Sequence, residues 1–78
     1  MKILVVEDEA LLRHHLHTRL GERAFVVDAV ADAEEALYRA QEFNHDIAIV
    51  DLGLPGMSGL DLIRQLRGQG RSLPILIL

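Results

Sequence analysis

The chain contains no cysteine among its 78 residues, so it forms no disulfide and has no thiolate metal site or cysteine nucleophile. That composition is compatible with a reducing cytosol. No apolar run approaches the roughly 18–20 residues that span a bilayer, so no membrane partner is expected. The opening run MKILVVEDE is not a signal peptide, because its apolar part is short and leads directly into acidic residues.

Positive charge is also scarce. Eight basic residues face twelve acidic ones, which gives a net charge of −4. Because no basic stripe is present, these residues are poor candidates for holding DNA themselves. Hydrophobic residues make up 50% of the chain, which is too many for a disordered segment. The length accommodates one domain, and a domain of this size buries only roughly 60% of its unfolded surface.

Short apolar runs predict four strands, at residues 3–6, 25–30, 47–50 and 74–78. Three helices are predicted between them. The first presents Leu12, Leu16 and Leu20 to the core and ends near Gly21. The second is capped by Asp32 with an acid three residues later, and the third is capped by Ser58 and ended by Gly68 and Gly70. Their expected inward residues are Ala33, Ala36, Leu37 and Ala40 in the second helix, and Leu62, Ile63 and Leu66 in the third.

The order β-α-β-α-β-α-β indicates an α/β fold. Strands that are apolar on both faces and alternate with helices predict a doubly wound parallel sheet. With the strand order 2-1-3-4, ligands would bind between the first and third strands, beyond their carboxyl ends.

Three acidic residues are expected to meet at that point. Glu7 and Asp8 follow the first strand, and Asp51 ends the third. Neighbouring strands are about 4.8 Å apart, so acids distant in sequence become neighbours. Crowded carboxylates repel one another unless a hard cation such as Mg²⁺ neutralises them. Without that cation, we expect the pKa of at least one of the three to be raised.

A carboxylate can also act as a nucleophile and form an aspartyl-phosphate. Asp51 is the better candidate, because it ends a strand and precedes a loop containing Gly53, Gly56 and Gly59. In that loop a phosphoryl group could approach the backbone. Any one acid at a strand end is ordinary, so the prediction depends on the conjunction of three acids with the doubly wound pattern.

Several sequence runs resemble the receiver domain of two-component response regulators. They are VVEDE after the first strand, IAIVDLGLPGMSGLDLIRQLR around the third, and LPILIL as the fourth. The resemblance covers the whole chain without gaps, as the first two-thirds of such a domain with the flavodoxin-like receiver fold. The runs ALLRHHL and DIAIVDLGLP resemble transcriptional regulators of the OmpR/PhoB type.

The resemblance implies specific roles. Asp51 would accept a phosphoryl group from a sensor histidine kinase in a Mg²⁺-dependent, cytoplasmic reaction. Asp8 would hold Mg²⁺ directly, Glu7 largely through water, and Gly53 through its main-chain carbonyl. Pro55 and Gly59 would shape the loop beside the acceptor. The chain would serve as a phosphoacceptor rather than an enzyme.

The resemblance also implies features that lie beyond these residues. A receiver has a hydroxyl residue ending its fourth strand and a lysine ending its fifth, followed by a C-terminal DNA-binding domain in this type of regulator. The only lysine here is Lys2, in the first strand, and Ser72 precedes the fourth strand. We therefore expect residues 1–78 to be an incomplete receiver, truncated after strand 4. It would contact DNA only through a domain outside this chain.

An open, apolar fourth strand is the expected consequence, and it suggests that the 78 residues are not an independently stable monomer. Either further residues complete the sheet, or two chains associate by strand-4 pairing or domain exchange. A self-associating module without phosphoryl signalling therefore remains an alternative. A dehalogenase-type phosphatase is disfavoured, because its second aspartate would stand where Gly53 is. Dinucleotide and P-loop binding lack their glycine motifs after the first strand.

Three further groups of residues can be interpreted, the first two as ordinary surface features. His14 and His17 share a helix face but find no carboxylate to complete a metal site, and His15 is expected to turn partly inward. The cluster Arg64, Arg67 and Arg71 is expected to be a surface patch, with a partner contact as the alternative. Leu54 and Met57, beside Asp51, are expected to be exposed interface residues.

Overall fold

The computed structural model describes all 78 residues, in which strands and helices alternate. In chain order the elements are β1 (Lys2–Val6), α1 (Ala10–Glu22), β2 (Val26–Val30), α2 (Ala33–Glu42), β3 (Ile47–Val50), α3 (Gly59–Gly68) and β4 (Ile75–Ile77). The four predicted strands and three predicted helices are confirmed, and the strand bounds differ from the prediction by no more than one residue at either end. None of the helices is both long and apolar enough to cross a membrane.

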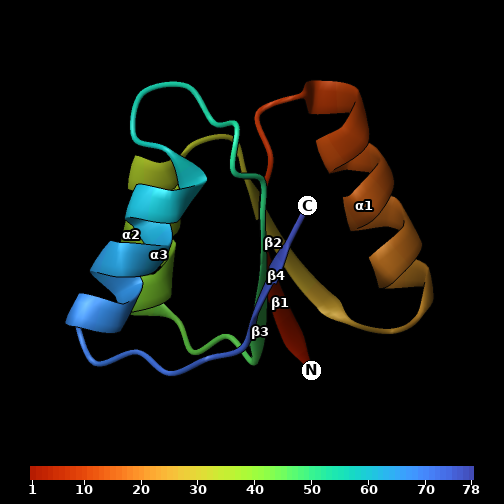
Figure 1. Ribbon diagram of the computed structural model, residues 1–78. Coiled ribbons are helices and arrows are strands. Elements are labelled where there is room, and N and C mark those ends of the chain that lie inside the picture. Colours follow the sequence, from red (N-terminus) through yellow and green to blue (C-terminus); the bar gives the residue numbers. More distant parts are fainter.

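The strands form one parallel sheet in the predicted order β2-β1-β3-β4. Val6 of β1 pairs with Val30 of β2 and with Val50 of β3, so these three strands end at the same level. Helix α1 covers one face of the sheet, while α2 and α3 lie side by side over the other (Figure 1). The strand order reverses between β1 and β3, and in open α/β sheets ligands bind at that point, beyond the carboxyl ends of the strands.

The face beneath α2 and α3 carries the main hydrophobic core. Leu4 and Val6 of β1 and Ala48 and Val50 of β3 are completely buried there. The predicted inward residues of the helices join them: Ala33, Ala36, Ala40, Leu62 and Leu66 belong to the core, and Leu37 packs against it. The small side chains of α2 let this helix lie close to the sheet. Ile63 was predicted to turn inward but is only half-buried, because it lies about 100° around α3 from Leu62.

The opposite face is covered by α1 alone. It shields Ile3 and Val5 of β1, yet no residue of α1 is itself buried. The predicted leucine stripe is therefore only partly correct: Leu16 and Leu20 are half-buried, whereas Leu12 is 41% exposed. The prediction that His15 turns inward is wrong, since this side chain is exposed. A helix without a neighbour on its own layer buries only the narrow strip that touches the sheet.

Side-chain caps fix where the helices begin. The Asp32 carboxylate accepts a hydrogen bond from the Glu35 amide at 2.8 Å, and the Ser58 hydroxyl accepts one from the Asp61 amide at 3.1 Å. Both predicted caps are confirmed, and each satisfies an amide that the first helical turn leaves free. The third cap, Glu9 at the start of α1, bears directly on the acidic cluster described below.

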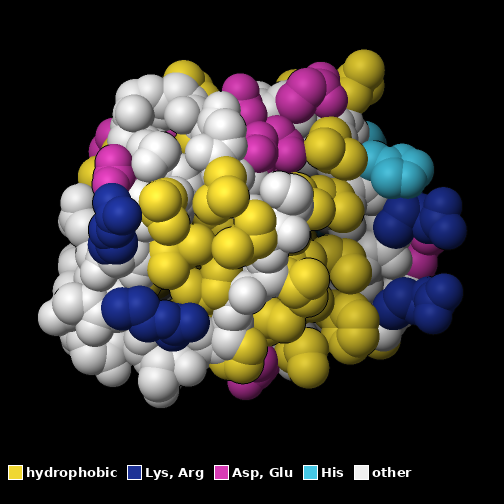
Figure 2. Space-filling model, viewed as in Figure 1, with side chains coloured by type: hydrophobic (Ala, Val, Ile, Leu, Met, Phe, Trp, Pro, Cys, Tyr) yellow, Lys and Arg dark blue, Asp and Glu magenta, His cyan; other side chains and the backbone are white.

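The edge strand β4 pairs only with β3 and carries an apolar surface. Leu76, Ile77 and Leu78 are each slightly more than half exposed. Figure 2 shows hydrophobic side chains gathered across the middle of the molecule's face on the β4 side. Among residues 1–78, β4 is therefore an edge strand with an exposed apolar surface, as expected.

Candidate functional site

The three acids predicted to meet do so at the carboxyl end of the sheet. β1 ends at Val6 and β3 at Val50, and the two residues are paired, so the segments that follow leave the sheet together. Carboxylate oxygens of Glu7, Asp8 and Asp51 all lie within 4.8 Å of one another. We call these three residues the carboxylate cluster. The positions of these acids at the ends of two strands, together with the expected strand order, were sufficient to predict the cluster.

Asp51 is held by its own backbone and by the loop after it. Its amide donates to the Val6 carbonyl at 3.0 Å, which extends the β1–β3 ladder by one residue. Its Oδ1 accepts a hydrogen bond from the Gly53 amide at 3.0 Å. Asp51 is half-buried, whereas Gly53 is exposed, so a group arriving from solvent can reach the carboxylate.

Gly59 lets α3 begin close to the Asp51 backbone, in keeping with its predicted shaping role. The Gly59 amide lies 3.4 Å from the Leu52 carbonyl oxygen. A Cβ atom at position 59 would lie 2.8 Å from the Leu52 Cα and closer still to the Asp51 carbonyl oxygen. Only glycine fits between these backbones without displacing them. Pro55, the other predicted shaping residue, lies exposed at the surface.

The prediction that Leu54 is an exposed interface residue is wrong. Leu54 is 6% exposed and belongs to the core under α2 and α3, while Met57 is half-buried and packs against that core. The exposed apolar side chain in this loop is instead that of Leu52, at 39%. Sequence pattern could not assign these positions, because an irregular loop has no periodicity from which direction can be inferred.

The β1–α1 segment is ordered by hydrogen bonds from its own residues. The Glu9 carboxylate accepts from the amides of Leu11 at 3.2 Å and Leu12 at 2.8 Å, and so caps α1. The Glu9 amide donates in turn to Glu7 Oε2 at 3.0 Å. The acids at the start of α1 thus divide into one cap, Glu9, and two members of the cluster.

Sequence reasoning missed Arg13, which also reaches this segment. Its Nη1 donates to the Glu7 carbonyl at 3.0 Å and lies 3.3 Å from the Asp8 carbonyl oxygen. The available signal was its position one turn into the helix that follows two acids. Long helical side chains lean toward the N-terminus, so Arg13 is placed to reach back over them.

Burial makes Glu7 the unusual member of the cluster. It is only 3% exposed, and this burial raises its pKa above the ordinary value of 4.5. The negative charge of Asp51 raises the pKa further, while the hydrogen bond from the Glu9 amide acts in the opposite direction. The expectation that at least one pKa in the cluster is raised is therefore confirmed, with burial rather than repulsion as the larger cause.

The cluster contains no cationic side chain of its own. None of the ion pairs in the structure includes Glu7, Asp8 or Asp51. Mg²⁺ prefers oxygen ligands at about 2.0–2.1 Å, so two ligands on one ion are separated by roughly 3–4 Å. Oxygens that all lie within 4.8 Å of one another fit that requirement after small adjustments. The donor set and its spacing suit a small hard divalent cation.

The remaining polar groups singled out in the sequence do not form a site of this kind. His14 and His17 line a shallow hollow with Ala10, Arg13 and Ala29, but no group of three metal-ligating side chains forms there. Arg64 pairs with Asp61 at 3.3 Å on the surface.

Arg67, a member of the predicted basic cluster, stabilises the chain segment that follows α3. It donates to the carbonyls of Arg71 and Leu73, at 3.0 and 2.8 Å, and so fixes the segment that leads into β4.

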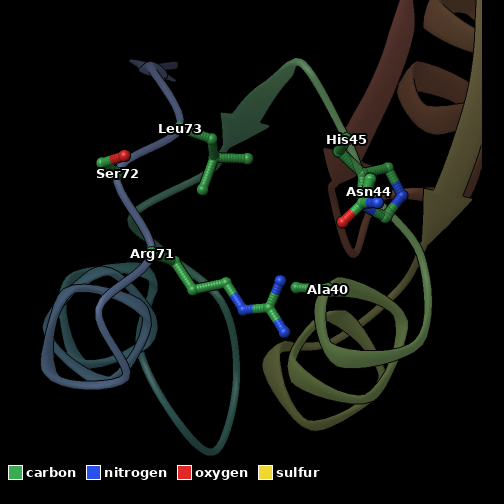
Figure 3. A pocket seen from close by; sticks show the side chains of 6 residues that line it. All are labelled: Ala40, Asn44, His45, Arg71, Ser72 and Leu73. Carbon is green, nitrogen blue, oxygen red and sulfur yellow. The ribbon is translucent and has the colours of Figure 1, made fainter.

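A separate hollow of about 180 Å³ lies at the amino ends of β3 and β4, with Arg71 extending across it toward Ala40 (Figure 3). Its lining residues are Ala40, Asn44, His45, Arg71, Ser72 and Leu73. None of the carboxylate cluster contributes to it. This hollow and the carboxylate cluster are therefore at different places in the fold.

The sequence resembles known proteins along its whole length. A profile described as "Response regulator receiver domain" matches residues 3–78. The "Two-component response regulator PhoP" of Pseudomonas aeruginosa is 78% identical over all 78 residues, and the chain spans 35% of the length of that relative. The runs ALLRHHL and DIAIVDLGLP themselves resemble PhoP, and the match over the whole chain confirms this resemblance.

Solved structures share the fold. The response regulator TrrA of Thermotoga maritima, crystallised in complex with Mg²⁺-BeF, is 34% identical with a TM-score of 0.91, over 97% of this chain and 66% of that one. The chain is also similar to a crystal structure of the histidine kinase ThkA in complex with TrrA. There the identity is again 34%, over 97% of this chain and 66% of that one, and the TM-score is 0.89. The flavodoxin-like fold predicted from the sequence is confirmed.

Proposed function

The chain belongs to the response regulator receiver domain family, and we propose that it accepts a phosphoryl group on Asp51 from a sensor histidine kinase. The observation that carries the proposal is the carboxylate cluster, whose three acids lie together at the strand-order reversal without a cationic partner. A structural acid cluster would be expected to include its own counter-charge. A cluster without one is suited to bind a cation from solution.

We assign the following roles in Mg²⁺ binding and phosphoryl transfer. Asp8 would bind Mg²⁺ directly, Glu7 largely through water, and Asp51 and the Gly53 main-chain carbonyl would complete the protein ligands. When bound, the ion neutralises charge on the transferring phosphoryl oxygens and allows two anionic groups to meet. A carboxylate oxygen of Asp51 attacks the phosphorus, the bond from phosphorus to the donor breaks, and an acyl phosphate forms. The Gly53 amide, which donates to Asp51 Oδ1, orients that carboxylate.

The TrrA structures support both halves of this proposal, since that regulator was crystallised with Mg²⁺-BeF and with a histidine kinase. The similarity to PhoP favours a PhoQ-like kinase as the donor. DNA binding would belong to a further domain of a PhoP-like regulator, because residues 1–78 carry a net charge of −4 and no basic stripe. We place the reaction in the cytoplasm and regard the chain as an acceptor rather than an enzyme.

The test is to incubate the chain with acetyl phosphate and Mg²⁺ and to map the adduct by tandem mass spectrometry. We expect one phosphoryl group on Asp51 and none when EDTA replaces Mg²⁺. Asp51→Asn should abolish the adduct while leaving the circular dichroism spectrum unchanged. The matched control is Asp61→Asn, an exposed acid on α3 that is paired only with Arg64. An adduct on any other acid, or one that forms equally well in EDTA, would contradict the proposal.

The β4 edge favours a second candidate function, self-association. Leu76 and Ile77 of β4 and the adjacent Leu78 are exposed, and β4 has one free edge, so a second copy could pair along β4 or exchange an element. On this basis we expect the 78 residues to be marginally stable as a monomer. Sedimentation velocity between about 10 and 500 μM tests this, since such species typically associate at micromolar to millimolar concentrations. A monomer with a cooperative melt throughout that range would exclude this function.

A further inference from the structure

We infer that Arg13 is a positioning residue, which holds the two metal carboxylates of the β1–α1 segment in place by binding their main-chain carbonyls. The inference rests on the Mg²⁺ site proposed above and assigns a role to a side chain that is not itself a ligand. Arg13 lies on α1, and a single nitrogen, Nη1, contacts the carbonyl oxygens of Glu7 at 3.0 Å and Asp8 at 3.3 Å.

The contact from Arg13 reaches the β1–α1 segment at Asp8, which has the fewest other hydrogen bonds. The Glu7 amide is bonded to the Val30 carbonyl at 3.1 Å, and the Glu7 side chain accepts from the Glu9 amide. Asp8 is exposed, and the contact from Arg13 is the only hydrogen bond that reaches its backbone. Fixing this carbonyl restricts the rotation of the Asp8 backbone and therefore the direction of its side chain.

The position of Arg13 on the helix makes the tether rigid. Its amide donates to the Glu9 carbonyl at 2.9 Å, so its backbone is part of the first turn of α1. Glu9 also caps that turn through the amides of Leu11 and Leu12. The cap and the arginine thus tie the segment to one helix from two sides. Outer-shell contacts of this kind orient metal ligands and typically change metal affinity when they are removed.

Arg13 also brings a positive charge near the site. The effect of this charge on Mg²⁺ affinity is opposite to the effect of the tether. A cation beside the cluster repels Mg²⁺, so removing the charge alone would strengthen binding. Removing a tether would weaken it, because the ligands must then be ordered by the metal. The direction of the change in Mg²⁺ affinity therefore distinguishes positioning from simple electrostatics.

The experiment compares Arg13→Met, which keeps the apolar stem, with Arg13→Lys, which keeps charge and donors. Arg19→Met is the control, since Arg19 lies on the same helix, is 65% exposed and pairs only with Glu22. Mg²⁺ dissociation constants are measured by calorimetry on the full chain. We expect Arg13→Met to bind about tenfold more weakly, Arg13→Lys to recover most of that loss, and Arg19→Met to match wild type. Unchanged or tighter binding by Arg13→Met would overturn the inference.

A second readout requires no metal. Amide hydrogen exchange at Glu9, whose amide donates to Glu7 Oε2, should be faster in Arg13→Met than in wild type or Arg19→Met, with exchange in β1 and β3 unchanged. Equal exchange in all three proteins would also overturn the inference. If wild type itself fails to bind Mg²⁺, the proposed function fails, and the exchange measurement still decides the role of Arg13.

Discussion

Two groups of charged side chains in this molecule are built in opposite ways. Asp28 of β2 is 11% exposed and is fully paired, with Arg39 at 2.9 Å and with His45 at 3.1 Å. Arg39 also binds Glu35 at 3.0 Å. We call these four residues the Asp28 network. The carboxylate cluster lies at the carboxyl end of the same sheet, and its three acids have no such partner.

The difference separates a group that the chain neutralises itself from the group proposed to bind Mg²⁺. In the Asp28 network a buried carboxylate is neutralised by the chain itself, and it connects β2 with α2 and with the segment before β3. In the carboxylate cluster, no side chain of residues 1–78 supplies a neutralising charge through an ion pair. Within residues 1–78, the two groups therefore differ in charge balance and not in the presence of acids.

Breaking the Asp28 network should produce the largest change in stability. Asp28→Ala removes an acceptor from Arg39 and leaves the His45 ring, 1% exposed, without a partner on either nitrogen, since Nδ1 already has none. We expect the free energy of unfolding to fall by about 1–3 kcal/mol, measured by urea denaturation, with Mg²⁺ affinity unchanged. Asp28→Asn, which keeps one acceptor, should lose less. A loss of Mg²⁺ binding in Asp28→Ala would mean that the two groups are not independent.

Asp8→Asn should lower Mg²⁺ affinity without lowering the stability of the metal-free protein, the reverse of Asp28→Ala. We expect Mg²⁺ affinity to fall by about tenfold or more, roughly 1.4 kcal/mol, because a carboxylate of the proposed Mg²⁺ site loses its charge. The metal-free protein should be at least as stable as wild type, since one repulsive charge is removed. Calorimetry with Mg²⁺ and urea denaturation in EDTA measure the two quantities. Unchanged Mg²⁺ affinity would remove Asp8 from the site.

Glu7 should give the smallest effect, visible as a dependence on pH. Its pKa is raised in the folded chain, so the folded state holds the Glu7 proton to higher pH than the unfolded state. The stability contributed by this group is therefore complete below the ordinary pKa of 4.5 and is lost as pH rises through the folded pKa.

Glu7→Gln tests this directly, because it cannot ionise. In EDTA, the stability of Glu7→Gln relative to wild type should increase as pH rises above 4.5 and then level off. Saturating Mg²⁺ should reduce or reverse that advantage, because the ion stabilises the charged carboxylate of wild type. A difference that does not change with pH would show that Glu7 does not titrate in this way.

Local patterns predicted the fold because periodicity, caps and strand order all point the same way. The positions of Asp8 and Asp51 followed from strand pairing, which places two carboxyl ends at one level. The sequence did not predict which side chains point inward in irregular segments or in a helix with few neighbours. Leu54 is buried where exposure was expected, and Leu12 is exposed where burial was expected. Both depend on which elements lie nearby, and that is a tertiary property.

The pairing of charges was equally invisible in the sequence. Nothing in the order of residues joins Asp28 to His45, seventeen positions apart. The position of Arg13 in the first turn of α1 suggests that it reaches back, but it does not specify the two carbonyls that it contacts. These contacts form only after β2, α2 and the β1–α1 segment have taken their places. The sequence therefore identified the acids, while the structure is needed to tell which of them the chain neutralises itself.

The most direct test of this account is a Mg²⁺ titration of the wild-type chain followed by ¹⁵N NMR. We predict saturable binding to one site, with the largest shifts at Glu7, Asp8, Asp51 and Gly53 and none at Asp28. Shifts that spread over all surface acids without saturating, or that persist unchanged in Asp51→Asn, would contradict the claim that the carboxylate cluster is built to receive a cation.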